Sequence, residues 1–191
     1  MKAIPLALFA VLGACATASA PEQDYTLSVE TSASPVRSLP DVSIAVGAAR
    51  IPEMYDRPQL VVRASENRVR LLEQQRWAEP LKSGIPRVVA ADLGRLLGTT
   101  HTTSYPTAEA SDTGYRVALE VQRFDATPGQ GVDVDIAWRI HRLPGGPVRD
   151  GRTSTHEAAS GEYEALVAAQ SRALATVSRD IAQAIAASQG S

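Results

Sequence analysis

Cys15 is the residue best placed to do chemistry in this sequence, because it is the single cysteine among 191 residues. One thiol cannot form an intrachain disulfide or a cysteine-rich zinc site. It follows an apolar run from Ile4 to Leu12, which itself follows Lys2. A run of about nine residues is too short to span a bilayer, which takes about 20, but is typical of the apolar part of a secretory signal.

The end of this run has the pattern of a lipoprotein signal. Leu12-Gly13-Ala14-Cys15 places a branched apolar residue and two small residues before the cysteine, and so resembles a lipobox. The resemblance implies a signal peptide over residues 1–14, cleavage before Cys15, and acylation (for example with palmitate) of the Cys15 sulfur and the new amino group. Several acyl chains on one residue make a membrane anchor effectively permanent.

Two features of the next residues bear on processing and location. Ala16 stands where an aspartate would retain many lipoproteins in the inner membrane, which favours the periplasmic face of the outer membrane. The alternative is an ordinary signal peptide cut after Ala18-Ser19-Ala20. Pro21 follows that site directly, where proline is poorly tolerated, so we expect the lipidated form.

The remaining candidates for catalysis or metal binding are weak. His101, His141 and His156 lack HExxH spacing, and a metal site would have to recruit distant carboxylates. Asp133 and Asp135 share one face of a predicted strand, where a solvated outer face is the more common interpretation. A net charge of −2 and only 5% aromatic residues argue against nucleic-acid binding. We therefore expect a non-enzymatic protein with no metal and no cofactor other than the covalent lipid.

The rest of the sequence predicts a tether followed by one α+β domain. Residues 15–38 are rich in Ala, Ser, Thr and Pro, which is typical of a flexible tether, and residues 39–191 are expected to form the domain. Helical spacing predicts helices over residues 83–98 and 162–187, with Gly98 ending the first. Alternation and turn residues predict strands near residues 42–48, 60–63, 68–74, 115–122, 132–141 and 151–157. The expected fold is a two-layer sandwich, with a mainly antiparallel or mixed sheet and both helices on one of its faces.

Two segments stand out because they combine prolines, arginines and an aromatic residue next to a strand or helix. The first contains Tyr55, Arg57 and Pro58, and the second contains Arg76, Trp77 and Pro80. In structural terms each proline fixes an entry angle and the tryptophan covers one end of the core. In functional terms the same residues could form a partner-docking surface, and the sequence leaves both interpretations open.

These segments also carry a family resemblance. "IPEMYDRPQLVVR", "RWAEPL" and the helix "IPRVVAADLGRLLG" resemble the ABC-type transport auxiliary lipoproteins, the PqiC-like group. The strands "YRVALEVQRFD" and "VDVDIAWRI" and the closing helix "YEALVAAQSRALATVSRDIAQAI" follow in the same order. The resemblance covers about residues 25–187, and the loop at residues 99–113 shows no such pattern.

The resemblance implies a non-catalytic part of a system that moves lipids or other hydrophobic compounds across the envelope. Such systems pair an inner-membrane ATPase and permease with periplasmic MCE-domain proteins, and the lipoprotein would dock that assembly at the outer membrane. A homo-oligomer that caps a tubular conduit is compatible with this role. The alternatives are a periplasmic carrier that holds a lipid between its sheet and helices, or an envelope assembly factor.

Overall fold

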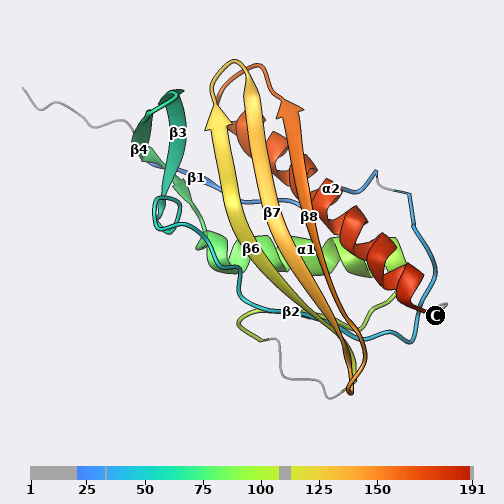
Figure 1. Ribbon diagram of the computed structural model, residues 1–191. Helices are drawn as coiled ribbons and strands as arrows, with labels where there is room; N and C mark the ends of the chain where they lie inside the picture. Colours follow the sequence, from blue (N-terminus) through green and yellow to red (C-terminus); the bar gives the residue numbers. More distant parts are fainter. Residues whose placement is uncertain (1–20, 33, 108–112, 190–191) are drawn as a thin grey trace, which may run out of the picture.

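The computed structural model describes residues 21–32, 34–107 and 113–189. Two helices and eight strands are assigned in these ranges, and Figure 1 shows their arrangement. In chain order they are β1 (Gln23–Tyr25), β2 (Ile44–Val46), β3 (Gln59–Ser65), β4 (Arg68–Trp77), α1 (Leu81–Leu97), β5 (Thr102–Ser104), β6 (Gly114–Thr127), β7 (Gly131–Leu143), β8 (Val148–Ala158) and α2 (Tyr163–Ser188).

The larger sheet has the strand order β5-β2-β6-β7-β8. The strands β6, β7 and β8 form an antiparallel meander, and β2 pairs in parallel with both β5 and β6. The predicted alternation is confirmed in β6 and β7, where apolar side chains such as Val117 and Ile136 are fully buried and their sequence neighbours are more exposed. Long alternating runs form these strands because every second side chain faces the core.

Both helices cover the same face of this sheet, which confirms the predicted α+β architecture (Figure 1). The long helix α2 packs across β6, β7 and β8, while α1 packs on β2 and β5 and against α2. Leu93 of α1 and Leu174 and Ile181 of α2 are completely buried. The core therefore lies between the sheet and the helix pair.

Helix α1 begins beside the segment that follows β2, and a proline helps to make that contact. Pro86 lies inside α1 and has no N–H for the carbonyl of Lys82, four residues earlier. The backbone N–H of Ala49 donates to this carbonyl instead, at 3.3 Å. At the other end Gly98 adopts a left-handed conformation with φ of 63°, as predicted, so the chain can turn away from the helix.

The smaller sheet, of order β1-β4-β3, was not predicted. The strands β3 and β4 form an antiparallel hairpin beside the larger sheet, and β1 pairs with β4 in parallel (Figure 1). The chain after β1 is also packed: Leu27 is buried, and the backbone N–H of Ser28 donates to the Ser171 hydroxyl of α2 at 3.1 Å. Residues 21–32, which the composition placed in a flexible tether, thus lie on the domain, because a few apolar side chains among small ones suffice to attach them.

A buried carboxyl group lies where the two helices meet. Asp92 of α1 is 3% exposed and accepts a hydrogen bond from the Ser178 hydroxyl of α2 at 3.2 Å. Burial raises the pKa of Asp92 to about 6, although the hydrogen bonds from Ser178 and from the backbone of Glu30 lower it. The folded protein therefore holds a proton on Asp92 at a pH where the unfolded chain has lost it.

This proton links the stability of the helix pair to pH. Because the pKa of Asp92 is higher in the folded state, its contribution to stability is present at low pH and is lost as pH rises through about 6. We expect the free energy of unfolding of wild type, relative to Asp92→Asn, to fall by on the order of 1 kcal/mol between pH 5 and pH 7. Urea denaturation at both pH values measures the difference in free energy of unfolding between wild type and Asp92→Asn. A difference that is the same at pH 5 and pH 7 would contradict the prediction.

Candidate docking site

The two segments that stood out in the sequence meet in space, because β3 and β4 are antiparallel. Gln59, the first residue of β3, pairs with Arg76 near the end of β4, and the Trp77 N–H donates to the Pro58 carbonyl at 2.7 Å. A surface pocket of about 210 Å³ opens where the base of this hairpin meets the start of α1. We call it the hairpin-base pocket, and its lining consists of Asp56, Arg57, Pro58, Trp77, Ala78, Glu79, Pro80 and Lys82.

Four of the six residues singled out in the sequence line this pocket. They are Arg57, Pro58, Trp77 and Pro80. Trp77 is 9% exposed and belongs to the core, so it supports the pocket from below. The carbonyl of Pro80 accepts the backbone N–H groups of Ser83 and Gly84, both at 2.9 Å, which fixes the start of α1. Trp77 and Pro80 thus both stabilise the fold and line the pocket.

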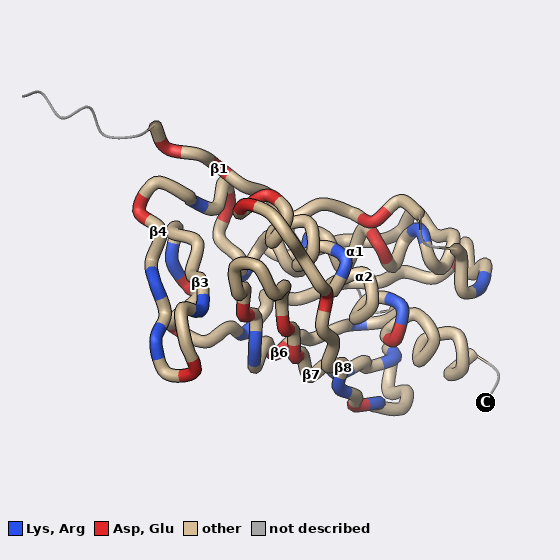
Figure 2. Tube along the Cα trace, turned by 90° about the horizontal axis from the view of Figure 1, so that it is seen from above, with Lys and Arg blue, Asp and Glu red and all other residues tan. Residues whose placement is uncertain are grey.

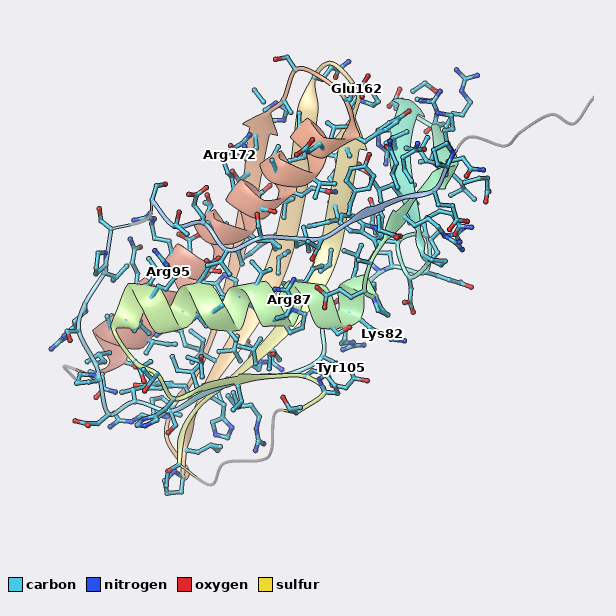
Figure 3. The ribbon with its side chains drawn as sticks, turned by 180° about the vertical axis from the view of Figure 1, so that it is seen from behind. Lys82, Arg87, Arg95, Tyr105, Glu162 and Arg172 are labelled. Atoms are coloured by element: carbon cyan, nitrogen blue, oxygen red, sulfur yellow. The ribbon has the colours of Figure 1, made fainter. Side chains whose placement is uncertain are left out.

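The pocket mixes charges of both signs. Glu79 is held by Arg87 of α1, whose Nη2 lies 2.5 Å from its Oε1. Lys82 extends from the first turn of α1, as Figure 3 shows together with Arg87. The Nε of Arg57 is buried but has no hydrogen-bond acceptor among the described residues. A buried donor without an acceptor is costly, so the structure gains stability from any rearrangement of Arg57 that brings an oxygen acceptor to this atom.

Tyr55 and Arg76, the other two residues, lie outside the pocket. Arg76 pairs at the surface with Glu22, with 2.9 Å between Nη1 and Oε1. Tyr55 is buried in the core, and its hydroxyl donates to Asp125 Oδ1 at 2.6 Å. Of the two roles that the sequence left open, Tyr55 therefore has the structural one.

Asp125 is the centre of an ion cluster that the sequence did not reveal as important. Arg63 of β3 donates from Nε to Oδ2 and from Nη2 to Oδ1, both at 2.9 Å. Arg123 donates from Nε to Oδ2 at 2.8 Å, and the Tyr55 hydroxyl completes the set. With Asp125 only 3% exposed, this shared carboxylate joins β3 and the loop before it to β6. We call these four residues the Asp125 cluster.

The electrostatics of the cluster follow from this geometry. Burial alone would raise the pKa of Asp125, but the hydrogen bonds from Arg63, Tyr55 and Arg123 outweigh it and hold the pKa below its ordinary value. The same environment acts in the opposite direction on the phenol, since burial and the bond to Asp125 raise the pKa of Tyr55 to about 12. Asp125 is thus ionised and Tyr55 protonated at neutral pH, and the stability that the carboxylate contributes is lost only in acid.

A change of register explains how a charged side chain comes to be buried here. The pairing of β6 with β7 shifts between Val121 and Arg123, and the strict alternation of β6 ends there. Phe124, Asp125 and Ala126 are then buried in succession, because β3 lies beside this end of β6 (Figure 1). In the sequence, the signal that could have indicated the cluster is the break in alternation at Gln122-Arg123, just before Phe124.

Neither the pocket nor the cluster has the composition of a metal site. Among the residues that the structure describes, no group of three or more His, Cys, Asp or Glu side chains could hold a metal ion. His156 pairs with Asp133 on the open face of the sheet, at 3.0 Å between Nδ1 and Oδ1. Asp135 is paired with Arg152. Cys15 lies outside the described residues.

Comparison with known proteins identifies the family. A model of the ABC-type transport auxiliary lipoprotein component matches residues 25–182. The chain belongs to this family. The match includes the Asp125 cluster and the hairpin-base pocket, and it confirms the family resemblance seen in the sequence. No curated protein matches the chain significantly.

Solved structures share the fold at low sequence identity. A Xanthomonas campestris protein of family DUF330 is 17% identical, with a TM-score of 0.71, over 88% of this chain and 97% of that one. An uncharacterized protein is also 17% identical, with a TM-score of 0.71, over 87% of this chain and 99% of that one. Both alignments cover nearly the whole length of those chains, so the likeness extends over most of this fold.

The Asp125 cluster gives a prediction about stability. We expect Asp125→Ala to lower the free energy of unfolding by about 2–3 kcal/mol, because two arginines and the Tyr55 hydroxyl lose their shared acceptor. The value is below that of a fully buried pair because both arginines reach solvent. Urea denaturation measures the change.

A matched control comes from an exposed ion pair on the same sheet. Arg139 and Asp150 pair on the open face, and both side chains are largely exposed. Arg139→Ala should leave the midpoint of denaturation unchanged. If Asp125→Ala were no more destabilising than Arg139→Ala, the cluster would not hold the hairpin to the sheet.

Proposed function

We propose that this protein is a lipoprotein anchored through Cys15 to the periplasmic face of the outer membrane. There it acts as a non-catalytic accessory component of an MCE/ABC-type system that transports lipids or other hydrophobic compounds across the envelope. The observation that carries the proposal is the family match over residues 25–182, behind a lipobox that ends at Cys15. In the described residues no helix is long and apolar enough to cross a membrane.

The hairpin-base pocket is the surface that we assign to the partner. It contains Arg57, whose buried Nε has no acceptor in the described part of the chain, together with the nearly buried Trp77 and charges of both signs. A pocket with an anchoring arginine and a rigid aromatic residue has the composition of a protein-binding hot spot. The partner on this account is the MCE-domain protein, which supplies an acidic or carbonyl oxygen to Arg57.

The alternative of a lipid carrier would place the acyl chain between the sheet and its helices. That space is filled by side chains such as Val89, Leu119 and Ile185, which are almost completely buried. A carrier would have to part this core, whose packing stabilises the fold. The docking role needs no such change, and we therefore favour it.

Charge reversal in the pocket tests the docking role. We expect the double variant Arg57→Glu, Lys82→Glu to reduce recovery of the MCE-domain protein from crosslinked cells by about tenfold or more, because like charges would face the partner. Affinity purification of the lipoprotein followed by quantitative mass spectrometry measures the recovery. The control is Arg139→Glu, which reverses a charge on the open face of the sheet. Equal recovery with both variants would contradict the assignment of this surface.

The anchor is tested separately by Cys15→Ser. We expect this variant to leave the outer-membrane fraction, because no acyl chain can be attached to a serine side chain by the same route. Fractionation of the cell envelope measures its location. A Cys15→Ser protein that stays in the outer-membrane fraction would rule out the lipid anchor.

A further inference from the structure

The outer part of the β3–β4 hairpin is exposed on both of its faces. Arg68, Val69, Arg70 and Leu71 are all exposed, whereas the corresponding stretches of β6 and β7 have one buried face. Val69 and Leu71 are 39% and 38% exposed, which places them among the few large apolar side chains that reach solvent. We call these four residues the hairpin tip.

The charge of the hairpin differs from that of the whole chain. Residues 59–77 contain four arginines and two glutamates, a net charge of +2, whereas the chain carries −2. Figure 2 shows the Lys and Arg positions gathered along β3 and β4. Glu66 and Glu73 are the acidic residues of the hairpin, and Glu73 accepts a hydrogen bond from Gln59 at 3.2 Å. Among the described residues the Arg68 side chain has no hydrogen-bond or ion-pair partner, and Arg70 has only the hydroxyl of Tyr163, at 3.3 Å.

The direction of β1 and the length of chain before it would allow an anchor at Cys15 to reach this tip. Because β1 is parallel to β4, the residues before Gln23 lead back toward the start of β4, which is Arg68. Gln23 pairs with Gln75, so Arg68 at the far end of the tip lies about 23 Å away along the strand. Cys15 lies eight positions before Gln23, and a chain of this length can span at most about 29 Å. The lipid on Cys15 can therefore bring a bilayer up to the hairpin tip.

We propose that the hairpin tip is a second membrane contact, in which Val69 and Leu71 enter the interface of a lipid bilayer and Arg68 and Arg70 bind anionic phosphate headgroups. This inference rests on the proposed anchor at Cys15. Adjacent apolar and basic residues on an exposed, narrow element suit the boundary between acyl chains and headgroups. There the apolar side chains contact acyl chains and the basic side chains contact phosphate groups. A basic residue near an anionic surface adds to the attraction, and a short tether keeps the tip near that surface.

The contact would orient the whole domain. The strand β4 runs from the tip at Arg68 to Trp77 at the hairpin-base pocket, a distance of about 30 Å. With the tip on the bilayer and β4 upright, the pocket lies about 30 Å from the membrane, on the periplasmic side from which an assembly based in the inner membrane would arrive.

Fluorescence of a tryptophan at the tip tests the contact. The full-length lipidated protein carrying Leu71→Trp is reconstituted into vesicles of phosphatidylethanolamine and phosphatidylglycerol, with or without brominated acyl chains as quencher. We expect the added emission, after subtraction of wild type, to shift to shorter wavelength and to lose about half its intensity or more with the brominated lipid. The control is Val148→Trp, at an exposed position of β8 (53% exposed), whose emission should be unaffected.

The outcomes separate this inference from the proposed function. If the Leu71→Trp protein floats with the vesicles but is quenched no more than the Val148→Trp protein, the tip does not enter the bilayer while the anchor stands. If the protein does not float at all, the anchor itself fails, and the membrane contact with it. Adding Arg68→Glu should reduce the quenching in these vesicles. The role of anionic headgroups would be overturned if the Leu71→Trp protein were quenched equally in phosphatidylcholine vesicles and in vesicles with phosphatidylglycerol. It would also be overturned if Arg68→Glu left the quenching unchanged in the vesicles with phosphatidylglycerol.

Discussion

The carboxylate of Asp125 is the interaction on which the arrangement of this molecule depends. The larger sheet and its two helices share a continuous apolar core with the base of the β3–β4 hairpin, but the outer part of the hairpin, from Arg68 to Leu71, extends beyond it. Two arginines and a tyrosine hydroxyl from three parts of the chain meet on this one buried group. A buried charge that is fully paired has a narrow set of good geometries, so the cluster fixes the angle of the hairpin as well as attaching it.

The attachment of the hairpin matters for function because the hairpin carries the pocket at its base and the exposed residues at its tip. Its base forms the hairpin-base pocket together with the start of α1, and its tip carries exposed apolar and basic residues. A rigid hairpin keeps these two surfaces at opposite ends of β4. The proposed membrane contact has the tip facing the lipid surface, and the proposed function has the base facing the partner, so a loose hairpin would lose the partner before it lost the anchor.

The sequence predicted the parts of the fold that local patterns encode. Alternation in β6 and β7, helical spacing in α1 and α2, and Gly98 all led to elements that the structure contains. The family resemblance was also available from the order of short segments and is confirmed by the match. What local patterns could not give was pairing between distant residues. The strands β1 and β5 have three residues each and acquire their structure only from their partners, β4 and β2.

The same reasoning applies to the site. Proline and tryptophan marked the two segments that form the hairpin-base pocket, because such residues are unusual beside a strand or a helix. Asp125 gave no comparable signal, since a lone aspartate after an alternating strand is usually solvated. Its burial depends on a register shift in β6 and on Tyr55 and Arg63, which lie at least 62 positions away in the chain. Only the folded arrangement shows that these residues belong together.

We propose that the hairpin-base pocket, held away from the membrane, receives the MCE-domain protein. The most direct measurement places a photo-crosslinking amino acid at Lys82, or at Arg68 in the hairpin tip, in the lipidated protein in living cells. The account predicts a crosslink to the MCE-domain protein from position 82 and none to it from position 68. A crosslink to that protein from position 68 with none from position 82 would contradict the account.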